Sequence, residues 1–134
     1  MGANADTVRS AYEAFGKGDV PGVLAAFDPN IDWQEPDTFA GIGFENQSSA
    51  QDVAQNIFAN VMQQFPDFSL AVDEIHESGD VVFSIGRYRG TSANTDKKLD
   101  TNFAHLWWFG PDGKAKAFRI HTDTHAWYEA LGKA

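Results

Sequence analysis

The sequence predicts one α+β domain in which helices pack on a mainly antiparallel sheet. The spacing of apolar residues is close to 3.6 as far as Pro66 and changes to 2 after it, which indicates helices first and strands later. Four alternating segments follow Pro66 and are joined by short turns, as in an antiparallel meander. The 134 residues suffice for one hydrophobic core, so residues 1–134 are expected to form a single domain.

Four segments carry a helical pattern. Val8, Ala11, Tyr12 and Phe15 recur at helical spacing in the first of them. In the third, Ser48 and Gln51 fit a capping box at the start, and Pro66 ends the pattern. We expect helices over about residues 6–16, 20–27, 48–65 and 125–131.

Five segments carry a strand pattern. They cover residues 31–35, 68–76, 81–91, 99–109 and 114–122. The run Gly110-Pro-Asp-Gly113 is a strong turn signal before the last of them. Residues 36–47 contain two glycines and are expected to form a loop at the mouth of any pocket.

Composition excludes several classes of function. The net charge of −9 and the pI near 4.6 argue against nucleic acid and against an anionic membrane surface as partners. The absence of cysteine excludes disulfides and thiolate chemistry. No signal peptide or transmembrane-length apolar run is visible, so we expect a cytoplasmic location.

Strand alternation suggests one internal face that mixes apolar and titratable side chains. Such a mixture is costly to bury unless the polar groups pair with each other or serve a ligand, and it resembles a small-molecule site. An ion-pair network of Arg119 with Asp123 or Glu35 would be a purely structural alternative. The expected face carries Trp33, Glu35, His105, Trp107, Arg119, His121 and Asp123.

Four of these residues are candidates for catalysis. Glu35 beside Trp33 is expected to be desolvated, which would raise its pKa and suit a general base. Asp123 could act as a second acid or base, or could cap the last helix. His105 could donate to an oxyanion or be an ordinary core histidine, and His121 could shuttle a proton.

Other residues would bind the ligand rather than transform it. Arg119 could hold a carboxylate, and the expected apolar walls are Trp33, Phe39, Phe58, Tyr88 and Trp107. His121-Thr-Asp123 with His105 has the form of a facial triad for iron, but the pattern is short and common. We therefore predict no metal and no cofactor.

The opposite face of the last strands is also apolar. Leu106 and Trp108 alternate with His105 and Trp107, so both faces of one strand carry bulk. A few helices cover only one face of a sheet, and an exposed apolar face usually marks a partner surface. A homodimer joined through this face is expected.

Two stretches resemble SnoaL-like and ketosteroid-isomerase-like proteins of the nuclear transport factor 2-like superfamily. One runs from Tyr12-Glu-Ala-Phe-Gly-Lys-Gly-Asp19 through Leu24-Ala-Ala-Phe27 to Ile31-Asp-Trp-Gln-Glu-Pro36. The other runs from His105-Leu-Trp-Trp-Phe-Gly-Pro-Asp-Gly-Lys114 to Phe118-Arg-Ile-His-Thr-Asp-Thr124.

The resemblance implies a cone-shaped, cystatin-like fold: a strongly curved, mixed or antiparallel sheet wrapped around a long helix, with an internal pocket and often a dimer. It aligns Glu35 with the proton-abstracting carboxylate of isomerases, His105 with their oxyanion-binding acid, and Asp123 with a carboxylate of cyclases. Their oxyanion tyrosine aligns with Ala11, one residue before Tyr12.

The predicted function is therefore that of a protein with a pocket for a small apolar or aromatic metabolite. Acid/base catalysis of the isomerase, cyclase, dehydratase or hydrolase type is the first expectation. A non-catalytic ligand-binding or dimerisation module of the same fold is the alternative, since a fold does not by itself determine a function.

Overall fold

A computed structural model describes residues 2–134. The chain begins with α1 (Ala3–Gly16), α2 (Val20–Leu24), β1 (Phe27–Gln34) and the short 3₁₀ helix η1 (Phe39–Ile42). A continuous helical stretch follows, composed of α3 (Ala50–Val53), the π-helical turn η2 (Ala54–Phe58) and α4 (Ala59–Gln64). The remaining elements are β2 (Ser69–Ser78), β3 (Val81–Thr91), β4 (Lys98–Phe109), β5 (Ala115–Thr122) and α5 (Thr124–Ala130).

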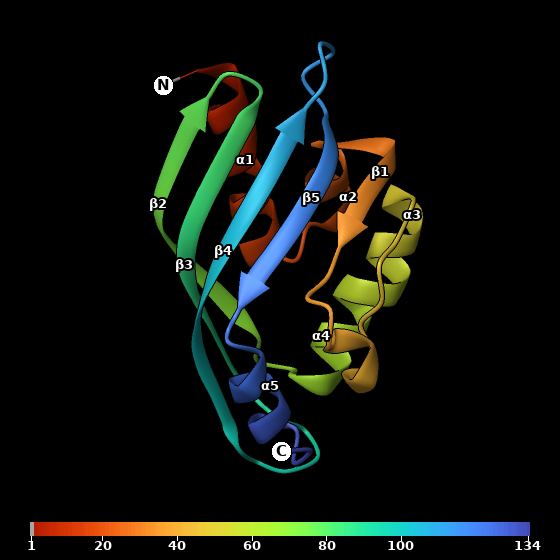
Figure 1. Ribbon diagram of the computed structural model, residues 1–134, viewed down its shortest axis with the longest axis vertical. Coiled ribbons are helices and arrows are strands. Elements are labelled where there is room, and N and C mark those ends of the chain that lie inside the picture. The colour runs from red at the N-terminus through yellow and green to blue at the C-terminus, as the bar shows by residue number, and fades with distance from the viewer. Residues whose placement is uncertain (1) are drawn as a thin grey trace.

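The five strands form one mixed sheet that is not closed into a barrel. Their order is β1-β5-β4-β3-β2, with β2 to β5 antiparallel and β1 parallel to β5 (Figure 1). The predicted α+β class with a mixed sheet is confirmed. The helices lie on one side of the sheet, and α5 lies beside the end where β3 and β4 bend (Figure 1).

The helical face of the sheet holds the core. Val8 and Ala11 of α1 are buried against it, and so are Ile57, Phe58 and Val61 of the long helical stretch. Each helix presents one apolar stripe, so a single layer of helices suffices to cover this face. None of the helices in residues 2–134 is both long and apolar enough to cross a bilayer.

Several element boundaries differ from the predicted ones, and β1 begins at Phe27 rather than at residue 31. The second helix ends at Leu24 rather than Phe27, since the Ala26 carbonyl accepts a hydrogen bond from Ala115 N (2.8 Å) and starts the pairing of β1 with β5. Tertiary pairing thus overrides the local helical pattern. The long helical stretch is capped by Ser49, whose side chain accepts from Asp52 N, one residue later than expected.

The pairing of β2 with β3 is irregular near its middle. A register shift between Val72 and Glu74 marks a bulge, and bulges increase local strand twist. Opposite it, a Cβ added to Gly86 would lie 2.0 Å from the Ala71 carbonyl oxygen, so only glycine permits this close approach. A Cβ on Gly90 would lie 3.2 Å from the Phe65 side chain, so Phe65 packs closely against this position of β3.

Candidate functional site

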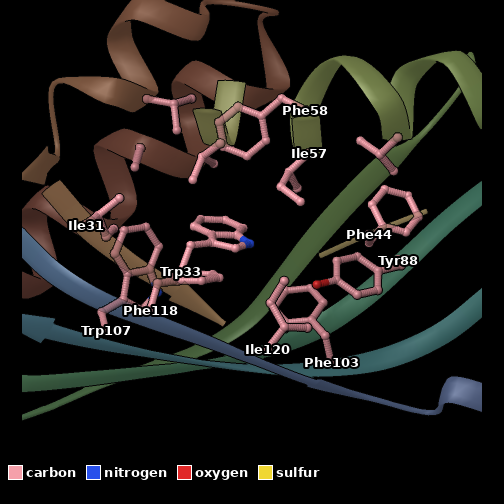
Figure 2. Close-up of a cluster of buried hydrophobic side chains, with 14 of the residues drawn as sticks. Ile31, Trp33, Phe44, Ile57, Phe58, Tyr88, Phe103, Trp107, Phe118 and Ile120 are labelled. Atoms are coloured by element: carbon pink, nitrogen blue, oxygen red, sulfur yellow. The ribbon is translucent and has the colours of Figure 1, made fainter. Parts of the chain in front are cut away.

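A cavity with an almost entirely apolar lining lies between the concave face of the sheet and the helices. An apolar hollow with a few polar groups is typical of sites for small organic molecules. Figure 2 shows how aromatic side chains from the sheet and from the helices converge on this region. The wall includes Ala11, Tyr12 and Phe15 of α1, Phe58 of the long helix, Phe39 of η1, and Trp33, Tyr88, His105, Trp107, Phe118 and Ile120 of the sheet.

The aromatic wall is tightly interlocked. Trp33 stacks on Phe118 with ring centroids 4.1 Å apart, and Phe58 meets Trp33 edge-on at 5.8 Å. At the other end, Trp127 of α5 packs against Phe39 at 5.3 Å. Rings held in this way keep little conformational freedom, so the wall of the cavity is largely preformed.

Among the described residues, 2–134, Glu35 is the one carboxylate that lines the cavity. It follows the last residue of β1, is 8% exposed, and accepts a hydrogen bond from the Trp33 indole nitrogen at 2.5 Å. Burial raises the pKa of Glu35 from its ordinary 4.5 to about 7, although the Trp33 hydrogen bond opposes this rise. No ion pair within residues 2–134 involves Glu35, so its carboxyl group exchanges a proton near neutral pH.

Replacing Trp33 by Phe is expected to raise the pKa of Glu35 above about 7. The substitution removes the only N–H that donates to this carboxylate among the described side chains and keeps an aromatic ring in the wall. Infrared difference spectra of the carboxyl stretch across a pH titration measure the shift. A pKa that is unchanged or lower in Trp33→Phe would contradict the assigned role of the indole.

His105 lies at the centre of a buried hydrogen-bond chain. Its Nδ1 is 2.7 Å from the Tyr12 hydroxyl and its Nε2 is 2.5 Å from the Tyr88 hydroxyl. Burial lowers the pKa of His105 from 6.5 to about 3, so the imidazole is neutral at physiological pH. A neutral imidazole donates through one nitrogen and accepts through the other.

Tyr12 is a residue of the site that the sequence patterns did not predict. Its hydroxyl also lies 2.5 Å from Ser84 Oγ and accepts from the Trp107 indole nitrogen at 3.3 Å. Alignment with relatives pointed to Ala11, and Tyr12 contributes from a neighbouring position on α1. A signal was available, since a tyrosine on the apolar face of a helix usually needs a partner for its hydroxyl.

The structure places three predicted site residues outside the cavity. Arg119, His121 and Asp123 are exposed, and none of them lines it. The side of the last strand that was expected to face the cavity was wrong. Trp107 pairs with Phe118, and His105 pairs with Ile120. Directly paired residues of antiparallel strands point to the same side, so Phe118 and Ile120 face the cavity instead.

The outward residues have structural partners of their own. The Asp123 side chain caps α5 by accepting from His125 N at 3.1 Å, and Arg119 donates to Gln34 on β1. The proposed ion pairs of Arg119 with Asp123 or Glu35 do not occur among the described residues. His105 therefore has neither His121 nor Asp123 beside it, and residues 2–134 contain no cluster of three potential His or carboxylate metal ligands.

The predicted cavity residues of the other strands and loops are brought together. Glu35 and His105 line the cavity along with Trp33, Phe39, Phe58, Tyr88 and Trp107. The loop that contains Phe39 is held in place, since Gln47 pairs with Trp33 and the Tyr128 hydroxyl donates to the Thr38 carbonyl. The mouth loop is thus attached to both β1 and α5.

Solved structures share this fold over nearly the whole chain. An NTF2-like protein of unknown function from Burkholderia pseudomallei K96243 is 33% identical, with 98% of each chain covered and a TM-score of 0.90. An NTF2-like protein from Burkholderia thailandensis E264 is 28% identical, with 98% of each chain covered and a TM-score of 0.90. TerC, co-crystallised with polyporic acid, is 23% identical, with 98% and 99% of the chains covered and a TM-score of 0.88.

The family is established by sequence as well. A search of curated proteins finds no match. The family model of the SnoaL-like domain matches residues 8–118, which run from within α1 to the middle of β5. The predicted resemblance is confirmed, and the cavity is that of a small-molecule-binding member of this fold. The chain belongs to the SnoaL-like domain family within the nuclear transport factor 2-like superfamily.

Proposed function

We propose that this protein catalyses proton transfer on a small cyclic molecule that carries a carbonyl oxygen, with Glu35 as the general base. The observation that carries the proposal is a carboxyl group buried on the wall of an apolar cavity with a pKa of about 7. A base with a pKa close to the working pH combines a useful deprotonated fraction with good proton affinity. Burial without a cationic partner is costly for a carboxylate, and such costs cluster at functional sites.

The rest of the cavity supports the same chemistry. Removal of a proton next to a carbonyl places negative charge on the oxygen, which needs a hydrogen-bond donor. The Tyr88 hydroxyl, next to the neutral His105 on the cavity wall, supplies such a donor. Burial raises the pKa of the Tyr88 phenol well above its ordinary value of 10, so it remains protonated when the ligand is bound.

The shape and polarity of the wall define the class of ligand. The wall offers the apolar ring faces of Trp33, Phe58, Trp107 and Phe118, and no arginine or lysine of the described part of the chain lines the cavity. An anionic ligand such as a phosphate ester would lack a counter-ion here. A flat one- to three-ring ketone, quinone or phenol fits better, and isomerisation, cyclisation or dehydration of such a molecule would each begin with proton transfer.

Hydrogen–deuterium exchange tests the proposal without knowledge of the natural substrate. The flat ketone 2-tetralone carries exchangeable protons next to its carbonyl, and NMR in D₂O follows their loss. We expect exchange above the buffer rate that saturates with ketone concentration. A protein that binds 2-tetralone yet leaves the exchange rate at the buffer value would instead support the non-catalytic binding module.

A homodimer through the outer face of the sheet forms part of the proposal. Phe83 is 37% exposed on that face and pairs with Leu106, while Val81 pairs with Trp108. The side chains of Val81, Leu106 and Trp108 are only partly buried in the single chain. A contiguous apolar surface of this kind is usually covered by a partner, and a second copy offers the same surface.

The variant Leu106→Lys is expected to be monomeric at concentrations at which the wild-type protein is a dimer. The substitution places two like charges opposite each other across the two-fold interface and removes apolar contact area. Sedimentation velocity measures the change. Ser10→Lys, at an exposed position of α1, is the charge-matched control and should remain dimeric; a monomeric wild-type protein at 100 µM would refute the dimer.

A further inference from the structure

We infer that the Tyr88 hydroxyl donates a hydrogen bond to an oxygen of the ligand, and that Ser84, Tyr12 and His105 keep this hydroxyl hydrogen free to do so. The inference deepens the proposed function, because it names the donor and the tautomer on which ligand recognition depends. It concerns binding alone and does not require that any chemistry follows.

The Tyr12 hydroxyl has three polar neighbours. The Trp107 indole nitrogen, 3.3 Å away, is only a donor and must occupy one lone pair of the Tyr12 oxygen. Ser84 Oγ at 2.5 Å and His105 Nδ1 at 2.7 Å remain. Tyr12 has a single hydrogen, so it donates to one of them and accepts from the other.

Ser84 decides between these two arrangements. Its side chain is fully buried, and within residues 2–134 the Tyr12 hydroxyl is the only hydrogen-bond partner of Ser84 Oγ. If Ser84 accepted from Tyr12, its own hydrogen would be buried without an acceptor, which is unfavourable. Ser84 therefore donates to Tyr12, both lone pairs of the Tyr12 oxygen are occupied, and the Tyr12 hydrogen points to His105 Nδ1.

The proton of the imidazole is consequently on Nε2. The ring is neutral, because its buried position holds the pKa near 3, and Nδ1 is already an acceptor. The Nε2–H then donates to the Tyr88 oxygen, 2.5 Å away. This bond leaves the Tyr88 hydroxyl hydrogen without its nearest possible acceptor, the imidazole ring.

The Tyr88 hydroxyl, which carries this unused hydrogen, lies at the cavity wall. Tyr88 is buried and lines the cavity wall, and Figure 2 shows its oxygen directed toward the middle of the cluster. Among the described residues no second protein acceptor lies within hydrogen-bonding distance of this hydroxyl. The two tautomers thus differ in where they leave an unmatched hydrogen: at buried Ser84, where no molecule can reach it, or at Tyr88, where a ligand can.

The site therefore selects an acceptor oxygen. A ketone, quinone or phenol oxygen would satisfy the Tyr88 hydrogen, whereas a hydrocarbon of the same shape would leave it buried and unpaired. The negative charge of ionised Glu35 also acts on Tyr88 and favours its protonated form. We expect the Tyr88 hydroxyl to determine the difference in affinity between ligands with and without such an oxygen.

The tautomer can be measured directly in the wild-type protein. Two-bond ¹H–¹⁵N correlation spectra distinguish Nε2–H from Nδ1–H imidazoles, and a His105→Gln spectrum identifies the His105 signals among those of the other three histidines. We expect the Nε2–H pattern at pH 7. An Nδ1–H pattern would overturn the inference, since the Tyr88 hydroxyl would then donate to His105.

Ligand affinity tests the donor itself with two probes of similar shape. Calorimetry would compare 2-acetonaphthone, which has a carbonyl acceptor, with 2-ethylnaphthalene, which has none. In Tyr88→Phe the ketone is expected to bind about 10-fold more weakly than to the wild type, while the hydrocarbon binds equally well or better. Unchanged binding of the ketone, or equal weakening of both probes, would overturn the inference.

The two measurements separate this inference from the proposed function. The wild-type protein could show no deuterium exchange activity and still have the predicted tautomer and probe selectivity. That result would leave Tyr88 as the hydrogen-bond donor of a non-catalytic binding module. Exchange activity with ketone binding unchanged in Tyr88→Phe would leave Glu35 as the base and remove the role of Tyr88. Binding of the hydrocarbon by Tyr88→Phe also shows that the variant retains its cavity.

Discussion

The variant Glu35→Gln is expected to lower the rate of enzyme-dependent proton exchange by on the order of 10²–10⁴-fold. The amide has nearly the shape of the carboxyl group and can still accept from the Trp33 indole nitrogen, but it cannot take up a proton at neutral pH. Initial rates of 2-tetralone exchange at several ketone concentrations separate the catalytic step from binding. We expect the loss in kcat, with KM changed little.

Two further carboxylates serve as matched controls for this experiment. Asp32 lies on β1, three residues before Glu35, but its side chain is exposed. Asp123 caps α5 and does not line the cavity. Asp32→Asn and Asp123→Asn should retain wild-type exchange rates. Equal activity of Glu35→Gln and Asp32→Asn would exclude Glu35 as the base.

The same substitution is expected to stabilise the protein at alkaline pH. The folded-state pKa of Glu35 is about 7, and its unfolded value is near 4.5, so the folded protein binds this proton more tightly. Its contribution to stability is therefore fully present below pH 4.5 and is lost as the pH rises through 7. Relative to Glu35→Gln, the wild-type protein should lose up to about 3 kcal/mol of unfolding free energy across this interval.

Denaturant unfolding at a series of pH values measures this difference. The two curves of unfolding free energy should run close together near pH 4.5 and separate until about pH 8, with Glu35→Gln the more stable. Asp32→Asn is again the control, since its exposed carboxylate should give no comparable separation. Parallel curves for the wild type and Glu35→Gln would show that Glu35 has an ordinary pKa.

The opposite effects of Glu35→Gln on activity and stability arise from one physical cause. A carboxyl group is a useful base here because it is buried, and the same burial penalises its charged form in the folded state. Catalytic residues often reduce stability in this way. A variant that gained stability without losing exchange activity would separate the two roles.

Local patterns in the sequence were sufficient to predict most of the helices and strands and most of the site residues that line the cavity. The change of period at Pro66, the cap at Asp123 and the turn at 110–113 are readable because each depends on neighbours a few residues away. Glu35 and His105 were predicted because each lies two residues from a tryptophan, on the same face of its predicted strand. The parallel pairing of β1 with β5 extended β1 back to Phe27, which no local signal indicated.

The face occupied by Arg119, His121 and Asp123 could not be derived in the same way. Alternation shows that Phe118 and Arg119 point to opposite sides, but only the pairing with β4 shows which side is inside. Both alternating sets of the last strand contain apolar residues, so hydrophobicity alone did not choose between them. Pairing Trp107 with Phe118 reversed the predicted assignment for the whole strand.

The sequence by itself determined the fold class, the family, and a buried carboxylate and histidine among aromatic rings. The tertiary structure alone decided which hydroxyls surround that histidine, since Tyr12 and His105 are 93 residues apart along the chain and Tyr88 and His105 lie on different strands. The physical reason is that hydrogen bonds form within about 3 Å, whereas sequence patterns constrain direction only within one helix or strand. The network of donors and acceptors at the cavity is thus a property of strand register and helix placement.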